Sequence, residues 1–269
     1  MVAHLINVCH NVDMDIDKMK EMYLSGNSVL KIGKELDIPS SKIYTAFSKD
    51  GFILRENKQN SRKYFVDHNF FEKIDNEIKS YWLGYLCADG YITGKDRSRR
   101  VGVTSKDIDH MTLFTQDLNS NYPVKVYEAT TSYGYTKYGR VLISSDKMYN
   151  DLSLHGCVAN KSKILLRPNI SEDLERHWIR GFLDGDGSLA VSKLAKSGFV
   201  IRVLGTEDVI LWIKEKIGGG VWFDQVKDIW YLDTTVTLER LEYIYGNSSR
   251  SLSRKFDRAL LAKQRLLAP

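Results

Sequence analysis

The stretch YWLGYLCADG at residues 81–90 returns, 97 residues later, as WIRGFLDGDG at residues 178–187. The glycines, the small residues and the aspartates of the two copies match at this one offset. Each copy is followed by an extended run, VGVTS or FVIRVLGT, and then by further strand-like and helical segments. An internal repeat at a fixed offset predicts two copies of one supersecondary unit. We therefore expect two halves, each running helix, two strands, helix, two strands, helix.

Within each copy, small residues recur one helical turn apart, as Gly84 with Ala88 and Gly181 with Gly185. Residues four apart lie on the same face of a helix, and small side chains on that face let two helix backbones approach closely. We expect the two motif helices to pack against each other along these faces. Their C-terminal ends then come together.

This packing places two carboxylates, Asp89 and Asp186, opposite each other. The arrangement is electrostatically unfavourable, because like charges meet at the negative ends of two helix dipoles. Mg²⁺ would offset the repulsion, since carboxylate and carbonyl oxygens are the hard ligands that it prefers. Each aspartate precedes a glycine, Gly90 or Gly187, which we expect to end its helix in the left-handed conformation. The alternative is two amphipathic helices that each happen to end in Asp-Gly, and the matched pair disfavours it.

At these residues the chain resembles the LAGLIDADG homing endonucleases in their monomeric two-motif form, over roughly residues 70–265. The resemblance implies an α+β fold with two pseudo-symmetric αββαββα repeats, whose curved sheets form a saddle over the DNA major groove. It also implies that Asp89 and Asp186 are catalytic and bind the divalent metal ions, with backbone carbonyls offered by Ala88 and Gly185.

The first copy departs from the family pattern at Cys87, where aspartate is usual and where the second copy has Asp184. In the family this position is not the metal ligand, so the departure leaves the expected site intact. The cysteines Cys9, Cys87 and Cys157 are odd in number and irregularly spaced, which indicates free thiols in a reducing compartment and no zinc site.

The end of each half carries a second resemblance. The runs GCVANKSK at 156–163 and LSRKF at 252–256 look like the family block that holds an active-site lysine. The resemblance implies a catalytic lysine in each half, which is Lys161 or Lys163 in the first and Lys255 in the second. The alternative is that these are surface lysines on terminal helices.

Basic residues on the predicted strands and loops of both halves are candidates for DNA binding. Alternation along a strand sends one face of each sheet toward DNA and the other toward the covering helices. Each of these residues also fits a solvent-facing charge. The candidates are Arg97, Arg99, Arg100, Lys125, Lys137, Arg140, Lys193, Lys196, Arg202 and Lys227.

Residues 13–56 predict a small unit of three helices. The run GNSVLKIGKELDIPSSKIYTAFSKDGFILRE resembles the resolvase-like helix-turn-helix family, with Ile38 filling the corner. We expect Ser40 or Ser41 to cap the third helix and Gly51 to end it. The alternative is trihelical packing without DNA binding. The resemblance implies that the third helix presents Ser40, Ser41, Lys42, Tyr44 and Thr45 to the major groove.

The run RENKQNSRK at 55–63 has no apolar residue and predicts a linker. We therefore expect a helix-turn-helix domain with its linker at 1–60, a first repeat at 65–169 and a second repeat at 170–269. The net charge is +5, and residues 250–269 account for that whole excess. The rest of the chain is neutral overall, so a polyanionic partner would bind there to local clusters of basic residues.

The chain has no apolar run near 18 residues and no signal-peptide pattern at its start, so we expect no membrane span and no secretion. The expected location is the cytoplasm, or wherever the target genome resides. The resemblance to the monomeric two-motif form implies a monomer that binds double-stranded DNA.

The resulting hypothesis is a site-specific homing endonuclease, a DNA hydrolase encoded for intron homing. The family resemblance implies Mg²⁺-dependent phosphodiester hydrolysis at a long asymmetric site, leaving short 3′ overhangs. One alternative is a DNA-binding regulator that no longer cuts, which the paired aspartates disfavour. Another is an RNA maturase on the same scaffold, which the helix-turn-helix disfavours. An intein is disfavoured, because it would begin with a nucleophilic residue and end in His-Asn, whereas this sequence begins Met-Val and ends Leu-Ala-Pro.

Overall fold

The computed structural model describes residues 15–54, 63–95, 98–131 and 134–268. The chain divides into two compact units, residues 1–63 and residues 64–269. The described ranges do not include the candidate DNA contact Arg97 or the thiol Cys9. Of the polar run at 55–63, they include only its last residue, Lys63. No helix within those ranges is both long and apolar enough to cross a membrane.

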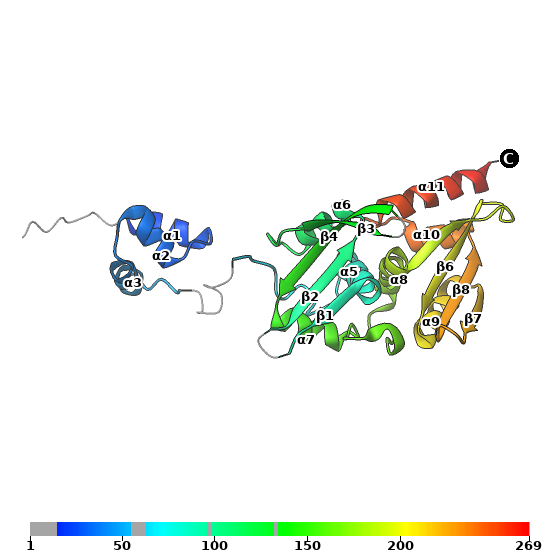
Figure 1. Ribbon diagram of the computed structural model, residues 1–269, viewed down its shortest axis with the longest axis horizontal. Helices are drawn as coiled ribbons and strands as arrows, with labels where there is room; N and C mark the ends of the chain where they lie inside the picture. The colour runs from blue at the N-terminus through cyan, green and yellow to red at the C-terminus, as the bar shows by residue number, and fades with distance from the viewer. Residues whose placement is uncertain (1–14, 55–62, 96–97, 132–133, 269) are drawn as a thin grey trace, which may run out of the picture. The chain divides into compact units, whose positions relative to one another are not determined.

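The N-terminal unit is a cluster of three short helices, α1 (Ile16–Leu24), α2 (Val29–Leu36) and α3 (Ser40–Lys49) (Figure 1). The side chains of Asp15 and Ser28 accept hydrogen bonds from backbone amides in the first turns of α1 and α2. Such caps satisfy amides that have no partner within the helix. The helices enclose a small apolar core of Met19, Tyr23, Val29, Ile32, Ile38, Ile43, Ala46 and Phe47.

The corner between α2 and α3 is as tight as the sequence predicts. Asp37 adopts the left-handed conformation, with φ of 54°, and the side chain of Ile38 is buried in the core. A Cβ atom on Gly33 would lie 2.6 Å from the carbonyl oxygen of Ile38, so the chain needs glycine there to turn this closely against α2.

The predicted cap of α3 is wrong. Pro39 holds the N-cap position, and Ser40 is already the first helical residue, with no side-chain cap. The left-handed residue Asp37 completes the turn early, so the chain enters the helix directly after the proline. The predicted end of α3 is confirmed, since Gly51 follows it with φ of 71°.

Residues 64–269 contain two halves with the same order of elements. The first half comprises α5 (Glu77–Ala88), β1 (Gly90–Thr93), β2 (Arg100–Ser105), α6 (Ile108–Asp117), β3 (Lys125–Thr131), β4 (Gly134–Ser144), α7 (Asp146–Leu154) and the short 3₁₀ turn η1 (Lys161–Lys163). The second comprises α8 (Glu172–Asp186), β5 (Gly187–Val191), β6 (Phe199–Gly205), α9 (Glu207–Ile217), β7 (Gly220–Asp224), β8 (Ile229–Thr235), α10 (Leu238–Tyr245) and α11 (Ser253–Leu267). The predicted αββαββα order is confirmed, and the second half adds the long helix α11.

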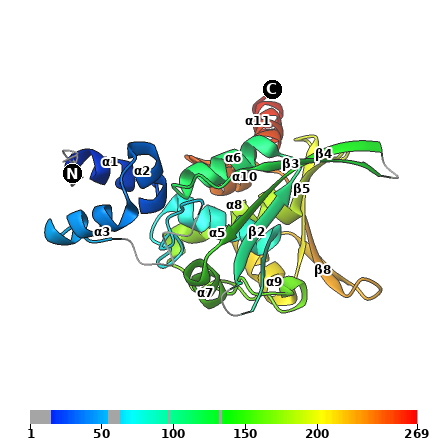
Figure 2. The ribbon, with the colours of Figure 1, turned by 60° about the vertical axis from the view of Figure 1, so that its left-hand side comes forward.

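Each half has one four-stranded antiparallel sheet, in the strand order β1-β2-β4-β3 or β5-β6-β8-β7. Val101 and Val103 of β2 are buried and Thr104 is exposed, whereas Gly102, on the same face as Thr104, is buried beneath the ring of Tyr91. The same alternation buries Ile201 and Val203 of β6 and leaves Arg202 exposed. Each sheet therefore has one face covered by helices and one open face. In Figure 2 the β3–β4 hairpin and the hairpin that ends in β8 extend beyond the helices on the same side.

The two motif helices, α5 and α8, pack backbone to backbone between the two sheets (Figure 1). A Cβ atom on Gly84 would lie 2.0 Å from the carbonyl oxygen of Trp178, and one on Gly181 would lie 2.0 Å from that of Tyr81. Real Cβ atoms do not approach a carbonyl oxygen so closely. The predicted contact along the small-residue faces is confirmed.

The predicted left-handed helix ends at Gly90 and Gly187 are wrong. Gly187 is extended, with φ of −93° and ψ of 171°, and Gly90 is the first residue of β1. Both helices run straight into a strand, and the added Cβ atoms would lie 2.6 Å from the carbonyl oxygen of Leu86 and 2.5 Å from that of Leu183. Lack of space, not backbone conformation, requires glycine at these positions.

Candidate active site

The α5–α8 packing brings Asp89 and Asp186 together. Asp89 is the C-cap of α5, and Asp186 is the last residue of α8. Between them the helices nearly touch, because a Cβ atom on Gly185 would lie 2.3 Å from the Cβ of Ala88 and 3.5 Å from the carboxyl carbon of Asp89. The four residues that the motif predicted as carboxylate and carbonyl donors thus lie at one point of the helix pair.

The two carboxylates repel each other. Burial, followed by the nearby charge of Asp89, raises the pKa of Asp186 to about 6. Asp89 is exposed as a whole residue, yet desolvation of its carboxyl group is still the largest influence and raises its pKa. The charges of Lys255 and Lys161, the nearby Tyr85 hydroxyl and the charge of Arg254 lower the pKa of Asp89 and act in the opposite direction. The charges of the two lysines therefore offset part of the repulsion between the two carboxylates.

Two buried lysines hold the ends of the motif helices. The ammonium group of Lys161 donates a hydrogen bond to the carbonyl oxygen of Gly90. That of Lys255 donates to the carbonyl oxygens of Leu183, Asp184 and Gly187, each at 2.6 Å. Burial lowers the pKa of Lys255 to about 8. Both ammonium groups interact electrostatically with Asp89 and Asp186.

The structure separates the two candidate lysines of the first half. Lys163 is exposed, and its ammonium group contacts the carbonyl of Lys227 and both the carbonyl and the carboxylate of Asp228, in the turn between β7 and β8. Lys161, two residues earlier, is only 9% exposed and lies beside the carboxylates. Lys161 is therefore the lysine of this half that the fold brings to the site.

The carboxylate of Asp184 has a structural role in the second half. It accepts hydrogen bonds from the Tyr81 hydroxyl at 2.9 Å, from the Tyr245 hydroxyl at 3.4 Å and from the Leu252 amide at 2.6 Å. These bonds fasten α5, α8 and the start of α11 together. In the first half the matched residue, Cys87, is buried against Cys157 instead. Only the mismatch at this motif position signalled the difference in the sequence.

Sequence reasoning missed four polar residues that form two pairs, of which Tyr85 and Arg254 lower the pKa of Asp89. They are Tyr85, whose hydroxyl is 3.4 Å from the Ser105 hydroxyl, and the bidentate pair of Arg254 with Asp107, at 3.0 to 3.2 Å. Tyr85 is visible in the motif itself, since the second copy has a phenylalanine there. The others come from distant segments, and no local pattern marks them.

A divalent cation fits the chemistry of this site. The described residues hold no cluster of three or more His, Cys, Asp or Glu side chains that could bind a metal ion. Two facing carboxylates do fit Mg²⁺, which commonly uses one or two carboxylates and takes its other ligands from water and phosphate oxygens. Backbone carbonyls of Ala88 and Gly185 are the remaining predicted donors.

The open face of the first sheet carries three of the predicted DNA contacts. Arg100 and Lys125 are exposed, and Lys125 pairs across the strands with Arg140. The guanidinium of Arg140 donates a hydrogen bond to the Tyr91 hydroxyl at 2.9 Å. Tyr91 covers Gly102, where a Cβ atom would lie 2.3 Å from its ring. This face is therefore cationic, and the ring of Tyr91 packs on its backbone at Gly102.

The open face of the second sheet is closer to neutral. Arg202 forms a bidentate ion pair with Asp233 at 2.8 and 2.7 Å. Lys227 lies in the turn after β7, 3.7 Å from Asp224 and over the ring of Tyr231. The predicted contacts Lys193 and Lys196 are exposed in the loop between β5 and β6 and not on a strand.

Two of the candidates point elsewhere. Arg99 contacts α7, where its guanidinium bonds Asn150 at 2.7 Å and lies over the ring of Tyr149. Lys137 pairs with Glu128 at 2.9 Å and alternates with Arg140, so it belongs to the opposite side of its strand. In the N-terminal unit, Ser41, Lys42, Tyr44 and Thr45 are exposed along α3, and Ser40 is half-buried.

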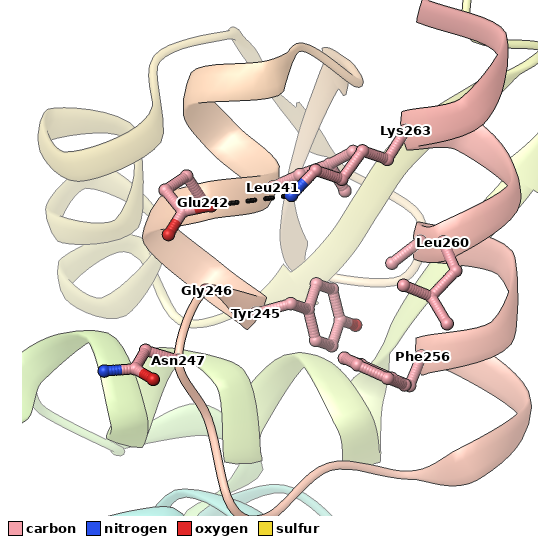
Figure 3. A pocket seen from close by; sticks show the side chains of 9 residues that line it. Leu241, Glu242, Tyr245, Gly246, Asn247, Phe256, Leu260 and Lys263 are labelled. Atoms are coloured by element: carbon pink, nitrogen blue, oxygen red, sulfur yellow. Dashed lines mark ion pairs between the residues drawn. The ribbon is translucent and has the colours of Figure 1, made fainter. Parts of the chain in front are cut away.

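A hollow lies between α10 and α11 (Figure 3). It has a volume of about 510 Å³ and is lined by Tyr245, Phe256 and Leu260, with Lys263 and Glu242 paired at 3.9 Å beside it. A smaller hollow of about 170 Å³ adjoins Asp186. Within the described part of the chain the two share no lining residue, so the larger one is separate from the carboxylate site.

We expect Lys255→Met to lower the free energy of unfolding by about 1–3 kcal/mol, because three largely buried carbonyl oxygens lose their charged donor. The matched control is Lys263→Met on the same helix, whose side chain is half exposed and should change stability by less than about 0.5 kcal/mol. Urea unfolding followed by fluorescence measures both. Equal effects of the two substitutions would contradict a capping role for Lys255.

No protein-family model matches the chain, and no curated protein matches it. Solved structures do match. The homing endonuclease I-WcaI bound to its DNA recognition sequence aligns with 82% of this chain and 98% of its own, at 16% identity and a TM-score of 0.50. The meganuclease I-SmaMI bound to uncleavable DNA aligns with 70% of this chain and 90% of its own, at 15% identity and a TM-score of 0.43. The N-terminal LAGLIDADG domain of DUF199/WhiA covers 72% of this chain and 93% of its own, at 12% identity and a TM-score of 0.42. The chain has the LAGLIDADG fold.

Proposed function

From this fold and its paired carboxylates, we propose that the protein is a site-specific endonuclease that cuts both strands of duplex DNA. The observation that carries the proposal is the pair Asp89 and Asp186 at the touching ends of α5 and α8, where burial and the charge of Asp89 raise the pKa of Asp186. A scaffold without a cation to bind has no use for such a pair. The DNA-bound homing endonuclease of the same fold agrees with this function.

The divalent cation, Mg²⁺ in this proposal, supplies charge neutralisation at the scissile phosphates. The chain's own residues hold it and shape the site. Asp89 and Asp186 provide one carboxylate for each half. Lys161 and Lys255 fix the carbonyl-bearing turns that follow the motif helices, and their ammonium charges lie beside the carboxylates. Positive charge held there favours a phosphate group close to both carboxylates.

The two open sheet faces provide the DNA-binding surface in this proposal. Arg100, Lys125 and Arg140 on the first sheet meet phosphates or base edges, and on the second Arg202 and Lys227 do so. Residues 15–54 add a helix-turn-helix, with the exposed side chains of α3 reading a further stretch of the major groove. The site is then long and asymmetric, because one end only carries the added unit.

The test is a two-step selection. Duplexes bound by the protein are enriched from a randomised library in Ca²⁺, and the winning sequence is then incubated with Mg²⁺. We expect one discrete double-strand break with short 3′ overhangs, mapped by end sequencing. Specific binding without cleavage in Mg²⁺ or Mn²⁺ would instead show a DNA-binding regulator. Preferential enrichment of a structured RNA in a parallel library would favour a maturase.

We expect removal of residues 1–63 to leave a folded protein that still cuts at high concentration, because both halves and their core lie within residues 64–269. DNA affinity should fall. The slope of log K against log salt should become shallower by about 0.9 for each phosphate contact that is lost. Footprints of the full-length and shortened proteins on the selected site should differ at one end only. Identical footprints and identical salt slopes would show that the N-terminal unit does not contact DNA.

A further inference from the structure

The open faces of the two sheets can be matched residue by residue through the strand register. Gly90 and Gly187, which follow the two aspartates, pair with Val103 of β2 and Val203 of β6. The two valines are therefore equivalent positions of the two halves. Both are buried on the covered face of their sheet, so the next residue along each strand lies on the open face.

At that next position the two halves differ in chemistry. The neighbouring strand places Arg140 of β4 there in the first sheet and Tyr231 of β8 there in the second. Arg140 pairs in turn with Lys125 of β3, and Tyr231 pairs with Trp222 of β7. One matched place on the open faces thus holds two cations in the first half and two aromatic rings in the second.

Trp222 and Tyr231 lie on the open face of the second sheet. Tyr231 precedes Leu232, which is fully buried in the core. Successive side chains of a strand point to opposite faces, so Tyr231 shares the face of Asp233, the partner of Arg202. Trp222 lies directly opposite Tyr231 and belongs to the same face.

The two rings form a rigid stack. Their centroids are 4.2 Å apart, and their planes differ by only 5°. Tyr231 is 8% exposed, whereas Trp222 exposes 45% of its surface. The ammonium group of Lys227 also lies over the Tyr231 ring. The side chain of Trp222 therefore presents a large apolar surface whose orientation is fixed before any partner binds.

The cations near this stack are paired with carboxylates. Arg202 forms its bidentate ion pair with Asp233, and Lys227 lies 3.7 Å from Asp224. At the matched place of the first sheet, two cations face each other across the strands instead. The second open face therefore offers apolar contact where the first offers positive charge.

We propose that Trp222 is a specificity-determining residue, which packs against thymine methyl groups in the major groove of the half-site that the second sheet covers. The thymine methyl is the apolar group that base pairs present in this groove, whereas Lys125 and Arg140 suit phosphates or guanine. A rigid aromatic side chain makes such a contact at a small cost in conformational entropy. The inference deepens the proposed endonuclease function and rests on its DNA-binding part.

The first test removes single methyl groups from the DNA. Each thymine of the selected duplex is replaced in turn by uracil, which keeps the hydrogen-bonding groups, and binding is measured in Ca²⁺ by fluorescence anisotropy. The wild type should lose about fourfold in affinity at one or two thymines of one half-site, as expected for one buried methyl group. Trp222→Ala should bind the unmodified duplex about 30-fold more weakly and should no longer distinguish thymine from uracil at those positions.

The matched control is Phe223→Ala. Phe223 is the next residue of β7 and is 40% exposed, so the substitution removes a similarly exposed ring from the opposite side of the same strand. This variant should discriminate between thymine and uracil as the wild type does, even if it lowers stability. The ratio of two affinities within one protein does not depend on the folded fraction.

The second test separates the two chemistries by salt. Trp222→Ala removes no charge, so the slope of log K against log salt should stay as it is in the wild type. Lys125→Met should make the slope shallower by about 0.9, as the loss of one phosphate contact does. A shallower slope for Trp222→Ala would contradict an apolar contact.

Uracil discrimination that is absent from the wild type, survives Trp222→Ala or disappears equally in Phe223→Ala would overturn the inference and leave the endonuclease function standing. None of these measurements needs cleavage. A protein that binds one duplex specifically and does not cut it would contradict the endonuclease function, and the same titrations would still decide the role of Trp222. Absence of specific duplex binding would overturn both.

Discussion

Asp186→Asn should reduce double-strand cleavage by about a thousandfold or more and leave DNA binding nearly unchanged, and Asp89→Asn should do the same. Loss of a cation that neutralises charge at the scissile phosphate costs several kcal/mol of transition-state stabilisation, and each 1.36 kcal/mol is a factor of about ten in rate. An amide is a poor ligand for a hard cation, whereas its size preserves the packing of α5 against α8. Single-turnover cleavage and filter binding on the selected duplex measure the two quantities.

The same substitution should stabilise the cation-free protein at neutral pH. Burial and the charge of Asp89 raise the pKa of Asp186 to about 6, whereas a carboxyl group in an unfolded chain titrates at about 3.9. Between these values the folded protein binds more protons than the unfolded chain, so the free energy of unfolding falls as pH rises through this window. Asparagine carries no charge. Above pH 6 the variant should therefore gain on the order of 1–3 kcal/mol over the wild type, and the gain should nearly vanish at about pH 4.

Asp257→Asn on the exposed face of α11 is the control for both measurements and should change neither. Cleavage by Asp186→Asn at the wild-type rate would remove this carboxylate from the chemistry. Parallel pH profiles of stability for the variant and the wild type would show that folding does not raise the pKa of Asp186.

The second large effect concerns the contact between the motif helices. Gly181→Ala should destabilise the protein by about 3 kcal/mol or more, because the new methyl group would lie 2.0 Å from the Tyr81 carbonyl oxygen and 2.8 Å from the Tyr85 amide nitrogen. Both neighbours are backbone atoms and cannot turn away as a side chain can, so the helices must separate. Separation also moves Asp89 away from Asp186.

Gly220→Ala in β7 is the matched control, since an added Cβ atom there meets nothing within 4 Å. Its unfolding midpoint should stay within the range of ordinary surface substitutions, about 0.5 kcal/mol. Urea unfolding at one pH compares the two variants. An unchanged midpoint for Gly181→Ala would contradict the backbone-to-backbone packing of α5 and α8.

The sequence by itself determined the repeat, the order of elements in each half and the meeting of two aspartates. These depend on local and periodic properties. Gly84 and Gly181 have no Cβ atom, and residues four apart share a helix face, so two such helices can pack closely. Alternation along β2 and β6 likewise predicts one covered and one open face of each sheet.

Tertiary structure decided which of the predicted side chains reach the site. Lys161 and Lys163 are equivalent in sequence, and only the path of η1 turns the first toward Gly90 and the second toward Asp228. Arg99 is the same residue type as its neighbour Arg100, yet its guanidinium group contacts α7 through Asn150. These outcomes depend on contacts between residues far apart in the chain, for which no sequence period exists.

The glycines after the two aspartates show the same division. Their presence in the sequence predicted the end of each motif helix. Glycine is required there because Leu86 and Leu183 leave no space for a Cβ atom, and not because the backbone is left-handed. A difference between the two halves has this origin too. Tyr85 and Phe182 differ by one hydroxyl group, and only the fold shows that this hydroxyl donates a hydrogen bond to Ser105. A side chain's type is written in the sequence, but its partners are set by the packing of distant segments.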